Sequence, residues 1–406
     1  MKRIAIITMG VRLKNENGYS RFYFLSEFLA KKGYDVDLIT TSFQHWAKEQ
    51  RDLDEVLKED YPFNLRFIPE PGYKKNIDMR RIVSHRIAAK NLTKMLENDG
   101  AYDLIYSEIP PNDVALAAAK YAKAHGIPFV VDVNDLWPEA MHMVIDIPVV
   151  SSILFYPLLR DAERVYAICS GVIGTSDEYA ERPFAKNKRD IPKDTVYVGN
   201  ELNIFDAGAE KNMPYIKKGK NEFWVTYAGT IGTSYDVRTM ILAADYLKKM
   251  GYSDIHFKIL GGGPLKEELE ELAEKLEGNV DFVGYAPYEK MAAYLKKSDI
   301  LVNSFVKKAP QSIVTKIGDY LAAGKPMINT CSSREFRNKV KEDKFGINIV
   351  AEDKTVLAEA VLELYEDEQK RINMGKQARK IAQEQFDRPN SYNKIVNLIE
   401  QLMSRE

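Results

Sequence analysis

The chain has 406 residues, which is too long for one ordinary core and indicates two or three domains. Hydrophobic residues make up 45% and charged residues 29%, a balance typical of a folded chain and not of a disordered one. The formal net charge is -1, which argues against nucleic acid as a partner, because no overall positive field would attract it. Two cysteines, Cys169 and Cys331, make no disulfide framework or zinc pattern and favour a reducing, cytoplasmic location.

The N-terminal apolar run predicts a first buried strand over residues 4–8. We do not expect a signal peptide there, because the run is short and Arg12 and Lys14 follow it. No apolar segment is long enough to be expected to span a bilayer.

The first half of the chain alternates short β-branched runs with helical patterns. Further strands are expected over residues 36–40, 65–68, 104–106, 129–133, 172–175 and 196–198. Helices are expected over residues 21–32, 80–98 and 113–125. This order predicts a parallel sheet with helices on both faces.

A polar, lysine-rich stretch over residues 205–222 interrupts the alternation and predicts an interdomain linker. The alternation restarts at residue 223. Strands are expected over 223–227, 256–260, 280–283, 300–302 and 326–329, and helices over 237–250, 265–276, 288–297, 314–323, 356–366, 369–385 and 390–403. The chain is therefore predicted to fold as two doubly wound α/β domains, with ligands bound at the carboxyl ends of the strands.

Two glycine loops follow strands of the second half. One contains Gly229 and Gly232, and the other is Gly261-Gly262-Gly263. Glycines let backbone N–H groups approach an anion, such as a phosphate, at a helix N-terminus. A tight structural turn is the alternative interpretation of each loop.

Lys316 and Asp319 are three residues apart and share a face of a predicted helix. There, Lys316 suits a phosphate and Asp319 suits the hydroxyls of a diol. The alternative is an exposed ion pair that contributes only a few tenths of a kcal/mol.

The motifs YAGTIG, FKILGGGP, VDFVGYAP, SDILVNS and TKIGDYLAAGKP occur in that order. This ordered set resembles the retaining family 4 glycosyltransferases of GT-B fold. YSEIPP and VDVNDLWPEA resemble the branch that builds bacterial surface polysaccharides. The resemblance implies two facing Rossmann-like domains with a cleft between them. Residues 1–204, completed by a helix over 387–406, would bind the acceptor, and residues 223–386 would bind the donor.

The resemblance also implies roles for residues around the donor. Asp319 matches the second acid of a paired-glutamate motif, which binds ribose hydroxyls, and Lys316 matches a phosphate-binding residue. Gln311 stands where the family has the first glutamate, which contacts the donor sugar. Tyr285 and Ala286 match the loop at the nucleobase.

Four further positions match less closely. Gly18 corresponds to a glycine loop near the donor phosphate, and Arg238 is a candidate for a second phosphate-binding cation. Glu108 and Asp135 follow strands of the first half, where acceptor-facing residues are expected. A carboxylate there would take the acceptor proton or stabilise positive charge at the anomeric carbon. Asp135 equally suits a helix cap, and we count Gln311 with Glu108 and Asp135 as the candidate catalytic set.

These features predict a metal-independent glycosyltransferase of the EC 2.4 class that uses no cofactor. The resemblance implies that it would move a sugar, with retention, from a nucleotide-sugar donor, a UDP-sugar, to a lipid-linked or polysaccharide acceptor in capsule, O-antigen, lipopolysaccharide or exopolysaccharide synthesis. The alternatives are a nucleotide-sugar epimerase of the same fold and a non-catalytic partner subunit, the latter suggested by Gln311.

Two other patterns bear on partners. Asp35-Val-Asp37 looks like a metal motif, but strand alternation explains it and no metal is expected. Basic residues alternate with apolar ones from Arg80 to Lys90. This segment is either an ordinary surface helix or a face that contacts anionic lipid, which would place the protein on the inner face of the membrane.

Overall fold

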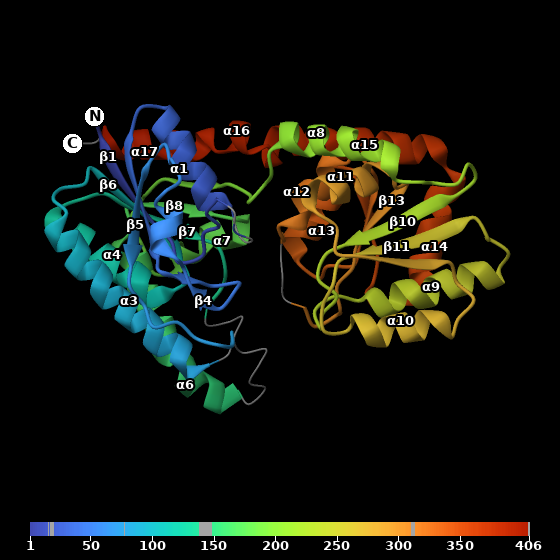
Figure 1. The fold of residues 1–406 in the computed structure, drawn as a ribbon, viewed down its shortest axis with the longest axis horizontal. Coiled ribbons are helices and arrows are strands. Elements are labelled where there is room, and N and C mark those ends of the chain that lie inside the picture. Colours follow the sequence, from blue (N-terminus) through green and yellow to red (C-terminus); the bar gives the residue numbers. More distant parts are fainter. Residues whose placement is uncertain (15, 17–19, 77, 138–147, 310–312, 405–406) are drawn as a thin grey trace. The chain divides into compact units, whose positions relative to one another are not determined.

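The computed structural model describes residues 1–404 apart from 15, 17–19, 77, 138–147 and 310–312 (Figure 1). The chain forms two compact units. Unit 1 comprises Met1–Val196 and Tyr392–Glu406, and unit 2 comprises Tyr197–Ser391.

Unit 1 is built on a seven-stranded parallel sheet with the order β5-β2-β1-β6-β7-β8-β9. Its strands are β1 (Arg3–Ile7), β2 (Asp35–Thr41), β5 (Asn64–Ile68), β6 (Leu104–Ile109), β7 (Phe129–Val133), β8 (Gly171–Gly174) and β9 (Lys193–Thr195). A small antiparallel pair joins β3 (Phe43–Gln44) to β4 (Glu49–Gln50). The described helices are α1 (Arg21–Lys31), α2 (Leu53–Val56), α3 (Met79–Asn98), α4 (Asn112–His125), α6 (Pro148–Ile168), α7 (Asp177–Glu181), η1 (Arg182–Ala185) and α17 (Asn393–Met403).

Helices cover both faces of this sheet because successive residues of each buried strand point to opposite sides. Ala5 and Ile7 pack in the core under α3, α4 and α6, whereas Ile4 and Ile6 pack in the core under α1 and α17 (Figure 1). The second core also encloses a buried ion pair between Arg21 and Asp132, whose side-chain atoms are 2.9 Å apart.

Unit 2 has a six-stranded parallel sheet with the order β12-β11-β10-β13-β14-β15. Its strands are β10 (Phe223–Ala228), β11 (Ile255–Leu260), β12 (Val280–Gly284), β13 (Ile300–Asn303), β14 (Met327–Asn329) and β15 (Gly346–Asn348). The helices are α8 (Leu202–Asn212), η2 (Met213–Tyr215), α9 (Val237–Lys249), α10 (Lys266–Glu274), α11 (Tyr288–Lys297), α12 (Lys316–Ala322), α13 (Arg334–Glu342), α14 (Lys354–Glu366), α15 (Glu368–Ile381), η3 (Ala382–Phe386) and α16 (Arg388–Ser391).

The stretch 205–222 differs from the predicted linker, because its first part belongs to helix α8. Leu202, Phe205 and Ala209 lie on the buried side of α8 within the core of unit 2. The carboxylate of Asp206, on the same helix, lies 2.6 Å from the ammonium of Lys296 on α11. The polar composition of the stretch hid Phe205 and Ala209, which continue the helical spacing that Leu202 begins, and that spacing decides the structure.

One strand boundary also differs from expectation. The strand expected over residues 196–198 lies earlier, at β9. Tyr197 instead stacks on Phe386, with ring centroids 4.5 Å apart, so this segment packs into unit 2. In the described part of the chain, no helix combines the length and the apolar character needed to cross a bilayer.

Candidate functional site

The first candidate site lies at the carboxyl edge of the sheet in unit 2. Strands β12, β11, β10 and β13 are neighbours and run parallel, so the loops that follow them gather at one edge. All the predicted donor-binding residues of the second half follow one of these strands.

The loops after β10 and β11 run directly against each other. A Cβ atom on Gly261 would lie 1.9 Å from the carbonyl oxygen of Gly229, and one on Gly263 would lie 2.3 Å from that of Ile231. Both glycines also have positive φ angles, 128° and 154°. They are therefore required by the packing of the two backbones. A Cβ on Gly262, by contrast, would meet nothing within 4 Å, so this glycine is open to a ligand.

Gly229 and Gly232 complete the loop after β10. Gly229 has φ 154° and donates its N–H to the carbonyl of Leu260 at 3.0 Å. At Gly232 a Cβ would meet only the methyl group of Thr230, at 3.6 Å. The first glycine is thus held in the turn, and the second has space beside it.

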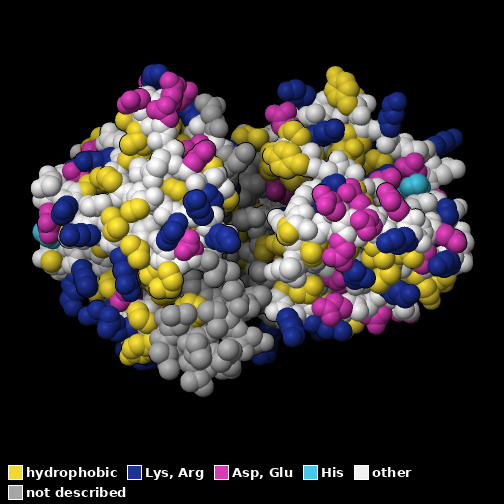
Figure 2. Space-filling view, turned by 60° about the horizontal axis from the view of Figure 1, so that its bottom comes forward, with side chains coloured by type: hydrophobic (Ala, Val, Ile, Leu, Met, Phe, Trp, Pro, Cys, Tyr) yellow, Lys and Arg dark blue, Asp and Glu magenta, His cyan; other side chains and the backbone are white. Residues whose placement is uncertain are grey.

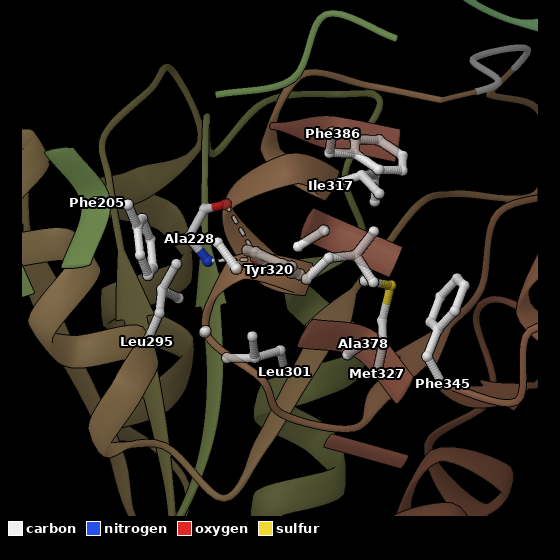
Figure 3. Close-up of a cluster of buried hydrophobic side chains, with 14 of the residues drawn as sticks. Phe205, Ala228, Leu295, Leu301, Ile317, Tyr320, Met327, Phe345, Ala378 and Phe386 are labelled. Carbon is white, nitrogen blue, oxygen red and sulfur yellow. Dashed lines mark hydrogen bonds between the residues drawn. The ribbon is translucent and has the colours of Figure 1, made fainter. Parts of the chain in front are cut away.

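Tyr320 fixes helix α12 against the end of β10. Its hydroxyl accepts a hydrogen bond from the N–H of Ala228 at 2.7 Å and donates one to the carbonyl of the same residue at 3.1 Å. Figure 3 shows this contact within the buried cluster that also holds Ile317. Because the buried side of α12 is anchored in this way, the positions of Lys316 and Asp319 on the same helix are set by the core.

Lys316 is enclosed by aromatic rings. Its Nζ lies 4.3 Å from the ring centroid of Tyr227 and 4.4 Å from that of Tyr235. The Nζ atom is buried and has no hydrogen-bond partner among the described residues. It faces the glycine loop, since a Cβ on Gly229 would lie 3.5 Å from it. Burial lowers the pKa of Lys316 to about 7, because the charged form has lost its water.

Asp319 lies one turn further along α12 and has different partners. Its Oδ1 accepts hydrogen bonds from the amide of Asn200 at 2.8 Å and from the hydroxyl of Tyr288 at 2.7 Å. Burial raises the pKa of this carboxyl group. The alternative prediction of an exposed ion pair between Lys316 and Asp319 is wrong, because α12 is anchored with the lysine ammonium inside an aromatic enclosure.

The loop after β12 lies beside the glycine loops. Gly284 accepts a hydrogen bond from the N–H of Gly261 at 2.8 Å, which ties the two loops together. Tyr285 is 79% exposed, and Ala286 packs against the core of unit 2. Arg238 is engaged elsewhere: it forms an exposed ion pair with Glu268 at 2.9 Å.

The second candidate site lies at the carboxyl edge of the sheet in unit 1. Glu108, at the end of β6, accepts hydrogen bonds on Oε2 from the hydroxyl of Thr8 and from the N–H of Met9 at 3.2 Å. Burial raises the pKa of Glu108 to about 7. A Cβ on Gly10 would be 3.7 Å from both Glu108 Oε1 and the Cη2 atom of Trp46, so the indole lies close to the carboxyl group.

Asp135 follows β7 at the same edge. Its Oδ1 accepts a hydrogen bond from the N–H of Leu136 at 2.8 Å, and burial raises its pKa. The helix that Asp135 was predicted to cap would run into residues 138–147, which lie outside the described part of the chain. Gly18 and Gln311 also lie outside the described residues.

A groove of about 830 Å³ adjoins Trp46, whose side chain is 43% exposed. Its other lining residues are mainly acidic or amide-bearing: Lys14, Glu16, Gln44, Ala47, Glu49, Gln50, Arg51, Asp52, Glu55, Val56 and Glu59. An aromatic face beside amide and carboxylate groups offers both apolar contact and hydrogen bonds to a sugar.

Sequence reasoning did not find a cluster of basic and aromatic side chains in unit 1. We call it the cation–aromatic cluster, and its members are His45, Lys48, Tyr73, Arg81, His85 and Trp137. These residues come from four separate loops and helices, so no motif spacing marks them. The only signal was the basic character of α3, whose Arg81 and His85 turn toward the cluster while Arg80 and Arg86 remain exposed.

Asp35 and Asp37, whose spacing looks like a metal motif, both accept hydrogen bonds from the amide of Asn64. Asp37 accepts hydrogen bonds from Arg3 at 2.6 Å, from Tyr102 at 2.7 Å and from Asn64 at 2.8 Å. Its carboxylate therefore holds β1, β5 and the start of β6 together. Within the described ranges, no three or more His, Cys, Asp or Glu side chains gather as a metal-binding group.

Comparison with known families gives a match within unit 2. Residues 209–381 match the family described as glycosyl transferases group 1. An uncharacterized glycosyltransferase of Methanocaldococcus jannaschii is 25% identical over 221 residues, which is 54% of this chain. The matched part spans about half the length, 54%, of that relative.

Solved structures establish the two-domain fold along the whole chain. The sucrose-phosphate synthase of Thermosynechococcus elongatus superimposes with a TM-score of 0.71 over 100% of both chains, at 17% identity. HepE of Anabaena, solved in complex with UDP, gives a TM-score of 0.67 over 100% of this chain and 99% of its own, at 16% identity. The predicted GT-B type of fold, with two parallel-sheet α/β domains, is confirmed.

Proposed function

We propose that the protein is a glycosyltransferase that takes a sugar from a UDP-sugar bound by unit 2 and transfers it to a saccharide acceptor bound by unit 1. The observation that carries this proposal is Lys316. A buried ammonium without a hydrogen-bond partner among the described residues is unfavourable by itself, and an anion at the glycine loop would stabilise it.

A nucleoside diphosphate fits the remaining groups at this edge. Its phosphates would lie between Lys316 and the loops of Gly229 and Gly262, where N–H groups and the ammonium would stabilise charge that develops on the leaving diphosphate. Asp319, oriented by Asn200 and Tyr288, would accept hydrogen bonds from the ribose hydroxyls. In this mechanism the positive charge comes from the protein, so we propose that the transfer needs no metal and no cofactor.

The related proteins support the same assignment. HepE of Anabaena has been solved with UDP and with UDP-glucose, and it shares the fold over the whole chain. The glycosyltransferase WaaG, which is involved in lipopolysaccharide biosynthesis, matches over 97% of this chain with a TM-score of 0.64. By analogy we propose that the product is a bacterial surface polysaccharide or its lipid-linked precursor, made with retention.

Glu108 is the acceptor-side group in this proposal. A carboxyl group whose pKa is about 7 exchanges its proton near neutral pH, which suits a general base for the acceptor hydroxyl. Asp135 follows β7, the strand that pairs with β6, at the same edge and would assist in holding the acceptor. Gln311 would contact the donor sugar through its amide.

A lipid-linked acceptor would require the protein to reach a membrane, and the exposed side of α3 suits this. Met79, Val83 and Ile87 are 63%, 51% and 37% exposed and lie four residues apart, on one side of the helix. The helix has no acidic residue from 79 to 96, and its exposed basic residues include Arg80, Arg86, Lys90 and Lys94. Figure 2 shows many Lys and Arg side chains, with hydrophobic ones between them, on the unit at the left of that view. We propose that this face contacts anionic lipid at the inner side of the membrane.

A thermal-shift measurement with UDP, UDP-glucose, GDP and ADP tests the donor site. We expect UDP and UDP-glucose to raise the melting temperature. Asp319→Ala is expected to abolish that rise and Lys316→Ala to weaken it. Lys308 is an exposed lysine in the loop that precedes α12. Lys308→Ala is the matched control and should respond to UDP like the natural protein.

Transfer is tested by incubating the protein with radiolabelled UDP-glucose and a membrane lipid extract. Label that passes into lipid or polysaccharide in the natural protein, and not in Glu108→Gln, would support the assignment. A protein that shows no response to any of the four nucleotides would contradict it.

A further inference from the structure

We propose that unit 1 holds a phosphate group of the acceptor between Lys48 and Arg81. The inference rests on the proposed function and specifies it, because it makes the acceptor a phosphate-bearing saccharide or lipid. It is carried by the geometry of the cation–aromatic cluster.

Two cations lie against one aromatic ring in this cluster. The Nζ of Lys48 is 5.1 Å from the centroid of the Tyr73 ring, and the Cζ of Arg81 is 5.3 Å from the same centroid. The Tyr73 hydroxyl forms a hydrogen bond with Nδ1 of His45, at 2.5 Å. The Nζ of Lys48 also donates a hydrogen bond to the carbonyl of His45, so one of its three N–H groups is used. Both positive groups are held against the same ring, and each has further N–H groups that no hydrogen bond between described residues uses.

Arg81 is placed more rigidly than Lys48. Its guanidinium lies 4.4 Å from the centroid of the Trp137 ring and donates one hydrogen bond, through Nη1, to the carbonyl of Asn76 at 3.0 Å. Its Nε is buried and has no hydrogen-bond partner in the described ranges. A planar guanidinium fixed between rings, with donors to spare, is suited to two parallel hydrogen bonds to a phosphate.

The carboxylates near the cluster are engaged with other groups. Glu70 accepts hydrogen bonds from the hydroxyl of Thr41 at 2.6 Å and from that of Ser84 at 2.8 Å, and burial raises its pKa. Asp135 accepts the N–H of Leu136. Burial lowers the pKa of Arg81, and both carboxylates lie near enough to raise it, but neither forms an ion pair within 4.0 Å of Lys48 or Arg81 among the described residues.

The electrostatics of the cluster agree with this placement. Burial lowers the pKa of Lys48, and the charge of Arg81 lowers it further. Burial also lowers the pKa of His45 to about 4 and that of His85 to about 3, so both histidines are neutral at pH 7. Two like charges pressed together in a partly buried site are stabilised by a bound anion.

The cluster lies next to the proposed acceptor carboxyl group. Trp46 packs edge-on against His45, with ring centroids 5.3 Å apart, and its Cη2 adjoins Gly10 beside Glu108. Trp46 therefore contacts the cluster through His45 and also adjoins Gly10, which lies beside Glu108. A sugar whose phosphate rests on Lys48 and Arg81 would place its ring on the exposed indole, with a hydroxyl directed toward Glu108.

Isothermal titration calorimetry on the full chain, saturated with UDP so that the donor site is occupied, tests the inference. The probes are glucose 1-phosphate, dihexanoylphosphatidylglycerol and glucose, and the first two separate a sugar phosphate from a lipid phosphate. We expect one or both phosphates to bind at least about 10-fold more tightly than glucose. Lys48→Asn should weaken the phosphate affinity about 10-fold and leave glucose unchanged.

Lys48→Asn is chosen because Lys48 has φ 62°, a left-handed conformation that asparagine adopts more readily than most residues. Arg81→Lys is the second variant. It keeps the positive charge but removes the planar guanidinium that can donate two parallel hydrogen bonds, so we expect a smaller loss of phosphate affinity than with Lys48→Asn. Lys123→Gln, in an exposed lysine of α4, is the matched control.

The outcomes separate this inference from the proposed function. Equal binding of glucose and both phosphates, or a phosphate preference that survives Lys48→Asn, would overturn the inference while the UDP response of unit 2 stays intact. Loss of the UDP response in the natural protein would defeat the proposed function itself.

Discussion

The carboxyl edges of the two sheets differ in whether backbone atoms or side chains form most of the candidate site. In unit 2 the edge is mostly backbone: Gly261 and Gly263 allow two loops to touch, and Tyr320 anchors α12 to β10. In unit 1 the edge is mostly side chains, with Trp46 and the cation–aromatic cluster around Glu108. Backbone contacts tolerate few substitutions, whereas side chains on loops can be exchanged. A backbone edge suits a constant ligand such as the proposed nucleotide, and a side-chain edge suits an acceptor that varies between relatives.

The two edges also hold ionisable groups that are perturbed in opposite directions. Glu108 in unit 1 and Lys316 in unit 2 both have a pKa near 7, the first raised and the second lowered by burial. Each group is kept partly neutral at physiological pH by loss of water. In the proposed mechanism, the group in unit 1 would exchange a proton with the acceptor, and the group in unit 2 would become fully charged when it binds an anion.

The largest expected effect tests the backbone nature of the unit 2 edge. Gly261→Ala should lower the free energy of unfolding of unit 2 by about 3 kcal/mol or more, because its Cβ would collide with the Gly229 carbonyl at a left-handed φ. Urea-induced unfolding measures the change.

Gly262→Ala is the matched control for this substitution. A Cβ at Gly262 meets no atom within 4 Å, so stability should stay within about 0.5 kcal/mol while UDP affinity falls. Equal destabilisation by both substitutions would show that the edge is not held by these backbone contacts.

The second prediction separates binding from stability at Lys316. Lys316→Met should weaken UDP binding about 10- to 100-fold, because a charge-assisted contact to phosphate is lost. In the absence of nucleotide the same variant should be at least as stable as the natural protein, since it removes a buried ammonium that has no partner in the described structure. Calorimetric titration and scanning calorimetry measure the two quantities, and a clear loss of unliganded stability would argue for a structural role.

The third prediction uses the opposite signs of the two pKa shifts. The folded state holds the Glu108 proton between its ordinary pKa of 4.5 and about 7, so this group makes unit 1 less stable as pH rises through that window. The folded state releases the Lys316 proton between about 7 and its ordinary 10.5, so this group makes unit 2 more stable as pH rises there. Each contribution is expected to be on the order of 1–2 kcal/mol after solvent access is allowed for.

Scanning calorimetry from about pH 5 to about pH 9 measures this comparison. Glu108→Gln should flatten the acidic side of the profile and Lys316→Met the basic side. Glu97→Gln, in an exposed glutamate of α3, should change neither. A profile that Glu108→Gln leaves unchanged would show that this carboxyl group titrates normally.

The smallest expected effect concerns the outer surface of unit 1. Arg86→Gln and Lys90→Gln on α3 should each weaken binding to phosphatidylglycerol vesicles about fivefold, which corresponds to about 1 kcal/mol per charge near an anionic surface. Lys376→Gln, in an exposed lysine of unit 2, should have no effect. Flotation with these vesicles at two salt concentrations measures the binding. Binding that does not change with salt concentration would contradict a charged contact.

Much of the fold was predictable because its signals are local. The strand–helix alternation marked β1, β2, β6 and β7, and the restart at Phe223 marked the second sheet. The predicted linker was wrong in its first part, which is helical. Leu202, Phe205 and Ala209 are few among many polar residues, and only the core into which they pack shows that they form the buried side of a helix. The basic segment of α3 was found, but its division into exposed Arg86 and enclosed Arg81 depends on packing.

By itself the sequence determined two doubly wound domains and the loops at which chemistry would lie, because hydrophobic periodicity and parallel topology direct the carboxyl ends of strands to one edge. Only the tertiary structure decided that packing requires a glycine at position 261 and leaves Gly262 open. It also decided that Lys316 forms no ion pair with Asp319, and that Lys48 and Arg81 lie against the same tyrosine ring. Those facts are contacts between residues far apart in the chain, and such contacts leave no periodic pattern along it.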